Sequence, residues 1–236
     1  MKPYRIKILG DEFLVCSSLQ KDEINPKERK ENTVIIGPSL KEDFKVSSYD
    51  IRQSPSPDLF SNAILATRFL IEKRGLPLEE FSFDVCGTNL NVFYTGEGVF
   101  TIKPQKCKLL YTKTELLKGC EVTIRDVNVG CVFRTVSVEN LKDFDKELLS
   151  LLTLTGECVP SAALASSLFS GTLSFSMLSD FSKRKPTELT AYVAAAYSEY
   201  LKSCGRVRSF TAKDERLKIE FTDGAIKICL KERYPG

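Results

Sequence analysis

The sequence predicts an α+β protein of two similar lobes, each with a curved, mostly antiparallel sheet around one central helix. Apolar residues recur at helical spacing in two segments, and we expect helices over about Asn62–Arg74 and Glu188–Ser203. Each expected helix is followed by a glycine, an apolar strand and a hairpin whose turn contains TGEG or TDG. We interpret the matched order as an internal repeat, and we place the lobes at residues 1–115 and 116–236.

The first expected helix has Ser61 and Asn62 at its cap, with Phe60 just before them. Segments rich in β-branched and aromatic residues predict four strands ahead of it, in YRIKIL, EFLVCS, NTVIIG and FKVSSYDI. A further helix is expected from about Glu139 to Leu149, where leucine and phenylalanine share one face. The segment PSAALASSLFSG is expected to form a short helix or coil.

Composition limits the classes of function. The chain has 236 residues, 42% of them hydrophobic and 28% charged, which is ordinary for a globular protein. A net charge of +3 gives no reason to expect nucleic acid or a membrane surface as partner. No apolar run approaches the ~20 residues of a spanning helix, and the first residues lack the pattern of a signal peptide. We therefore expect a cytoplasmic protein.

Cysteine and histidine usage narrows the chemistry. The eight cysteines are scattered without a CxxC pair, so we expect reduced, mostly buried thiols and no metal site. The CGTN stretch at Cys86 follows a predicted strand, which favours a turn, and Cys131 is expected to be a buried apolar thiol. The absence of histidine removes the commonest general base and any Cys–His or Ser–His–Asp nucleophile.

Four short segments carry a resemblance that covers most of the chain. LGDEF, NVGCV, TLSFSML and KIEFTDGAIKI occur in this order, and together they resemble the diaminopimelate epimerases. The resemblance implies a two-lobed, cofactor-independent epimerase in which a cysteine begins each central helix. One thiolate removes the α-proton, and the opposite thiol delivers a proton to the other face. The family also has a last strand that returns to the first lobe, and this sequence has no counterpart for it.

The catalytic positions of the family carry other residues here. The first cysteine falls on Phe60 and the second on Tyr192, so both acid/base thiols are replaced. Phenylalanine cannot transfer a proton, and tyrosine, with a pKa of about 10, would need a large depression to act as a base. Val193 and Ala194 replace glycines at the second helix start, and the family's histidine falls on Gly130.

The resemblance also assigns positions that would hold a ligand. Arg184 is suited to bidentate recognition of a carboxylate, although its basic loop, SKRKP, is equally typical of a solvated surface. Asp11 and Asp50 would bring negative charge towards the cleft. The full set of candidates is Asp11, Asp50, Asn62, Asn128, Arg184 and Glu188.

Two hypotheses follow. The first is a catalytically inactive relative that keeps the fold as a module binding a small anion, an amino-acid-like ligand or a protein, with oligomerisation left open. The alternative is a cofactor-independent epimerase, racemase or isomerase that uses Asp11, Asp58 or Tyr192 as acid/base groups. A filled interface in which Phe60 and Tyr192 pack together would favour the first hypothesis. An open pocket lined by carboxylates would favour the second.

Overall fold

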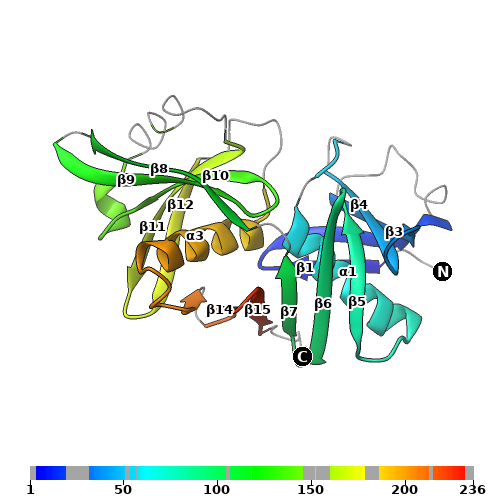
Figure 1. Cartoon of the computed structure of the whole chain (residues 1–236). Helices are drawn as coiled ribbons and strands as arrows, with labels where there is room; N and C mark the ends of the chain where they lie inside the picture. Colours follow the sequence, from blue (N-terminus) through cyan, green and yellow to red (C-terminus); the bar gives the residue numbers. More distant parts are fainter. Residues whose placement is uncertain are drawn as a thin grey trace.

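In the computed structural model, the described residues form fifteen strands, which make one sheet around two main helices. The structure describes residues 4–19, 32–50, 54–56, 58–104, 107–117, 119–145, 152, 160–178, 186–212 and 215–231. The strand order is β1-β2-β3-β4-β5-β6-β7-β15-β14-β13-β12-β11-β10-β9-β8. Figure 1 shows two halves, one around α1 and the other around α3, with β7 and β15 between them.

The elements of the first half are β1 (Tyr4–Ile8), β2 (Asp11–Ser17), β3 (Asn32–Pro38), β4 (Phe44–Tyr49), α1 (Leu59–Arg74), β5 (Glu80–Val85), β6 (Thr88–Gly96) and β7 (Val99–Pro104). Those of the second half are β8 (Lys108–Leu117), β9 (Cys120–Asn128), β10 (Val132–Ser137), the short 3-10 helix η3 (Leu141–Asp143), β11 (Ala162–Phe169), β12 (Thr172–Leu178), α3 (Glu188–Lys202), β13 (Ser209–Ala212), β14 (Leu217–Thr222) and β15 (Ala225–Leu230).

The two halves have the same pairing order. From β1 to β7 the successive pairings are antiparallel, parallel, antiparallel, parallel, antiparallel and antiparallel, with α1 between β4 and β5. The series from β9 to β15 is identical, with α3 between β12 and β13. The last strands of the two series, β7 and β15, pair antiparallel and join the halves. The predicted fold class is confirmed, and the structural repeat extends beyond the helix and hairpin seen in the sequence.

Each helix packs against the strands of its own half of the sheet. Along α1, Ile64, Leu65 and Phe69 are almost fully buried, and burying each such side chain contributes about 1.5–3 kcal/mol. Along α3, the fully buried run Ala194–Ala196 has side chains small enough for the strands to approach closely. One continuous apolar core therefore includes residues of both halves. Neither helix has the length and hydropathy of a membrane span.

Two local predictions are corrected by the start of α1 and by strand β11. Helix α1 begins at Leu59, three residues earlier than expected, because Asp58 rather than Ser61 or Asn62 is the N-cap. The PSAALASSLFSG segment forms strand β11, parallel to β10 and antiparallel to β12, instead of a helix or coil. The first six residues of β11, from Ala162 to Ser167, are all buried. A strand buried on both faces lacks the alternation of apolar and polar residues that identifies a half-exposed strand.

The helix expected from Glu139 is a single 3-10 turn in the described part. Asn140 caps η3 by accepting a hydrogen bond from the Lys142 amide at 3.0 Å. Residues 146–149 of the expected helix lie outside the described residues. The expected lobe boundary at residues 115 and 116 lies inside β8, which pairs with β9. We therefore propose that the boundary belongs in the connection between β7 and β8.

The link between the halves should be sensitive to Gly98. This glycine has φ +75° and accepts a 2.9 Å hydrogen bond from the Leu230 amide, and an added Cβ would lie 2.1 Å from the Leu230 carbonyl oxygen. Gly224 has nearly the same φ, +78°, with open space around it. Gly224→Ala should therefore cost only the backbone strain of about 1–2 kcal/mol. Gly98→Ala should cost about 2 kcal/mol more in urea denaturation, since it adds a clash. Equal losses would contradict this account of the link.

Candidate functional site

The N-terminus of α3 receives two carboxylates from the first half of the chain. The Thr187 amide, at the N-cap, donates to Oδ2 of Asp58 at 2.8 Å. The next amide, of Glu188, donates to Oδ2 of Asp11 at 2.9 Å. Helix N-termini attract anions because their first N–H groups lack partners within the helix and carry partial positive charge. Here the chain's own side chains supply those anions.

Three hydroxyl groups complete this contact. The Thr190 hydroxyl donates to Oδ1 of Asp58, and the hydroxyls of Ser61 and Thr187 lie 2.7 Å apart. Thr187 also caps its own helix by accepting from the Thr190 amide at 3.3 Å. We call Asp11, Asp58, Ser61, Thr187 and Thr190 the junction network. It connects the starts of α1 and α3.

Asp58 is the most constrained member of the network. Its residue is only 2% exposed, and burial raises the pKa of its carboxyl above the usual value. The hydrogen bonds from Thr187 and Thr190 act in the opposite direction, and the charge of Asp11 adds to the increase. Although Asp58 is the N-cap of α1, its side chain makes no cap bond there. Instead, its side chain accepts hydrogen bonds from Thr187 and Thr190 at the start of α3.

Apolar side chains occupy the first turns of both helices. Phe60, the second residue of α1, is fully buried, as is Leu189, the second residue of α3. Tyr192 lies three residues further along α3, is 7% exposed, and packs edge-on against Phe175 with ring centroids 4.6 Å apart. Phe60 and Tyr192 belong to the same apolar core. Counted from the N-caps, Leu189 corresponds to Phe60, and we propose it as the second counterpart of a catalytic cysteine.

The turn between β9 and β10 closes against the start of α1. Gly130 has φ +102°, and an added Cβ would lie 2.4 Å from Cγ of Leu59. A histidine at this position would therefore collide with Leu59, which is itself buried. Nearby, burial and then the charge of Asp58 raise the pKa of the Cys131 thiol, so Cys131 is not activated as a nucleophile.

The other sequence candidates divide into two groups. Asn62 is buried near the junction and donates to the Ser48 hydroxyl at 2.6 Å. Away from the junction, Asp50 accepts from the Ser54 amide at 2.8 Å in its own loop. Asn128 accepts from the Gly130 amide at 2.9 Å within the β9–β10 turn. Arg184 lies outside the described residues. The structure thus brings Asp11, Asp58, Asn62 and Glu188 towards the junction, whereas Asp50 is bonded within its loop.

Sequence reasoning missed Thr187, Thr190 and Leu59, and it assigned Ser61 only as a cap of the first helix. A cap could have been assigned to Thr187, because a threonine between Pro186 and the first helical residue is a common helix start. Nothing in the sequence indicates that the partner of this helix start is Asp58, 129 residues earlier.

A buried ion pair was also missed. Asp126 and Arg134 are opposite residues of β9 and β10, and two hydrogen bonds of 2.7 Å join them. A third bond runs from Nη1 of Arg134 to the Leu152 carbonyl. Because both side chains are at most 1% exposed and bonded to each other, the pair is structural.

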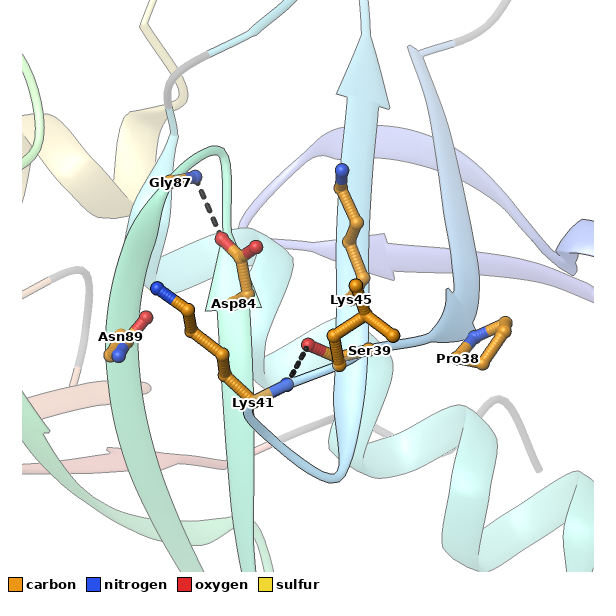
Figure 2. Close-up of a pocket in the computed structure, with 8 residues that line it drawn as sticks. Pro38, Ser39, Lys41, Lys45, Asp84, Gly87 and Asn89 are labelled. Atoms are coloured by element: carbon orange, nitrogen blue, oxygen red, sulfur yellow. Dashed lines mark hydrogen bonds between the residues drawn. The ribbon is translucent and has the colours of Figure 1, made fainter.

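Two surface hollows are lined by residues outside the junction network. The first, of about 580 Å³, separates the β3–β4 turn from the β5–β6 turn. In the view of Figure 2 the Lys41 side chain extends towards Asn89, Lys45 lies on the opposite side of Asp84, and Oδ1 of Asp84 accepts from the Gly87 amide at 2.8 Å. The CGTN stretch at Cys86 forms this second turn, as expected.

The second hollow, of about 800 Å³, runs along β1 to the end of β15. We call it the basic groove. The charged residues among its described lining are all cationic. They are Arg5, Lys7, Arg68, Arg216 and Lys231, of which Lys7 is ion-paired with Glu12 and Arg68 with Glu72.

Comparison with known proteins identifies the class of fold. No family model and no curated protein matches the sequence. Among solved structures, a protein described as a proline racemase from Agrobacterium radiobacter, with bound carbonate, is similar at 9% identity and a TM-score of 0.63, over 93% of this chain and 87% of that chain. A PhzC/PhzF-type phenazine biosynthesis protein from Clostridium difficile has 12% identity and a TM-score of 0.58, over 93% and 88%. A methylitaconate-delta-isomerase has 10% identity and a TM-score of 0.51, over 92% and 89%.

These likenesses show the fold and not the activity, since their identities are at most 12%. The chain has the α+β fold of PhzF-type proteins and proline racemases.

Asp58 should make stability depend on pH. Because burial raises its pKa in the folded chain, the folded state retains the proton to higher pH than the unfolded state. The resulting stabilisation is complete below the unfolded pKa of about 3.9 and is lost as the pH rises through the folded pKa. Asp58→Asn cannot titrate. In urea denaturation from about pH 4 to pH 8, it should gain stability relative to wild type by about 1.4 kcal/mol per unit of pKa shift.

The control for this experiment is Asp50→Asn, which removes a carboxylate outside the junction network. Its stability difference from wild type should not follow the Asp58→Asn trend. If Asp58→Asn lost stability relative to wild type as the pH rose, the folded pKa of Asp58 would be lowered and the assignment would be wrong.

Proposed function

We propose that this chain keeps a two-lobed isomerase fold without two-base proton transfer between its helix starts, and that it acts as a binding protein. The junction network carries the proposal. The amides of Thr187 and Glu188, which begin α3, donate to the chain's own Asp58 and Asp11. A substrate carboxylate would have to displace these two groups before it could bind the same amides.

The side chains at the helix starts also support this proposal. Abstracting an amino-acid α-proton and returning it to the opposite face requires two opposed acid/base groups. Phe60 and Leu189 supply none, and Tyr192 is packed against Phe175. The specific relation to the diaminopimelate epimerases rests on the four sequence segments alone, and we keep it as part of the proposal.

A cofactor-independent isomerase is the second candidate. The similar structures favour it, since the activities in their descriptions are those of a proline racemase and a methylitaconate-delta-isomerase. Within this chain, its best support is the Asp58 carboxyl, whose raised pKa suits a general acid or base. Against it, Asp58 is buried and hydrogen-bonded to Thr187 and Thr190.

Deuterium exchange separates the two candidates. Wild-type protein incubated in D₂O with proline, hydroxyproline, glutamate or diaminopimelate should leave the α-proton unexchanged in NMR spectra, because acid/base groups contribute ~10²–10⁴-fold each and both are replaced. The double variants Phe60→Cys with Tyr192→Cys and Phe60→Cys with Leu189→Cys should also show no α-proton exchange, because Asp11 and Asp58 still occupy the start of α3. Exchange by the wild type that Asp58→Asn abolishes would establish the isomerase instead.

The basic groove is the binding site that suits an anionic ligand, because its five charged lining residues are cationic and outnumber the two glutamates paired with Lys7 and Arg68. Glutarate, diaminopimelate or inorganic phosphate should raise the melting temperature at low ionic strength. Arg216→Glu with Lys231→Glu should abolish the increase, whereas Lys45→Glu, at the other hollow, should preserve it. The absence of any shift in wild type, or an equal shift in all three proteins, would argue against anion binding at this groove.

A further inference from the structure

Among the residues that the structure describes, strand β8 lies at one end of the sheet and pairs with β9 alone. Figure 1 shows the long β8–β9 pair at the outer margin of the second half. Unlike a typical protected edge, β8 is ten residues long and carries exposed apolar side chains. Leu110 is 44% exposed and Leu116 is 73% exposed. An edge of this kind is suited to pairing with another strand.

The register of β8 divides it into two parts. The pairing with β9 shifts between Leu109 and Tyr111, so a bulge interrupts the strand at Leu110. From Tyr111 to Leu117 the register is regular, and Thr114 is the central residue of this seven-residue stretch. Regular pairing with a further strand is therefore expected over 111–117, centred at Thr114.

Charges of opposite sign flank this centre. Lys113 and Glu115 lie on the same face of the strand, because they are two residues apart. Their side chains form an ion pair of 2.6 Å within the chain. An antiparallel copy of β8 related by a two-fold axis through Thr114 would place Lys113 of each copy opposite Glu115 of the other. Two reciprocal cross-strand ion pairs would result, one on each side of the axis.

We propose that β8 pairs antiparallel with β8 of a second copy of this chain, in the register that places Thr114 opposite Thr114. The pairing joins two sheets edge to edge and puts Leu116 of each copy opposite Thr112 of the other. An edge protected against self-association would place like charges opposite each other in its central register. This stretch does the reverse, since Lys113 and Glu115 are self-complementary about its centre. The proposal specifies one partner for the binding protein proposed above, but it holds for an isomerase as well.

Charge exchange tests the register. Sedimentation velocity over a concentration series should show a reversible dimer of wild type. Lys113→Glu alone places two carboxylates opposite each other at both contacts, and Glu115→Lys alone places two ammonium groups together at both. Each should weaken dimerisation about tenfold or more, because two attractive contacts become repulsive. The double variant should restore the wild-type dimer, and a mixture of the two single variants should form a heterodimer.

A covalent test reports the same register without depending on charge. Thr114→Cys should form an intermolecular disulfide under mild oxidation, and mass spectrometry should map it to residue 114 of both chains. Lys45→Glu, an exposed charge reversal on β4, should dimerise like wild type, and circular dichroism should show that all variants fold. A monomer at every concentration would overturn the proposal. So would a dimer insensitive to both single variants, or single variants whose mixture does not associate. Deuterium exchange and anion binding are measured in separate experiments, so their outcomes do not decide whether β8 forms the proposed dimer.

Discussion

The buried carboxylate of Asp58 connects the two halves of the molecule at the point where their helices begin. It accepts hydrogen bonds from the Thr187 amide and the Thr190 hydroxyl, and the surrounding protein leaves it almost no contact with solvent. Removing it would leave buried donors unsatisfied, which typically costs about 1–3 kcal/mol per group. The relative position of α1 and α3, and hence the packing of Phe60 and Leu189, depends on this contact.

If the chain is a binding protein, as we propose, the same contact accounts for the absence of a substrate site at the start of α3. An unoccupied helix N-terminus facing a cleft is a ready site for a carboxylate ligand. In this chain Asp11 and Asp58 bind that terminus from within, and Leu59 fills the space next to Gly130. Under the proposed function, these contacts occupy a potential ligand site with the chain's own side chains. Ligand binding and partner binding would then fall to the outer surface, at the basic groove and along β8.

Local patterns in the sequence predicted the fold well, because each half repeats signals that act over short distances. The two helices, the glycine after α1 and the TGEG and TDG turns follow from spacing and turn chemistry. The prediction of a short helix or coil at the position of β11 was wrong. The first six residues of this strand are all buried, so the sequence shows no alternation of apolar and polar residues. The junction network could not be predicted, since Asp58 acts on a helix that begins 129 residues later. Asp58 was identified only as an acid/base candidate, and its role as a cap for α3 required the three-dimensional structure.

The central claim is that the chain's own carboxylates bind the first amides of α3. Amide hydrogen exchange followed by NMR tests it most directly, because amides at a helix start exchange rapidly unless they have a hydrogen-bond partner. The amides of Thr187 and Glu188 should be strongly protected in the ligand-free protein. Asp58→Ala should lower protection at Thr187, and Asp11→Ala should lower it at Glu188, while α1 stays protected. Rapid exchange of both amides in the free wild-type protein, slowed only when an amino acid is added, would contradict the claim and point to an open ligand site.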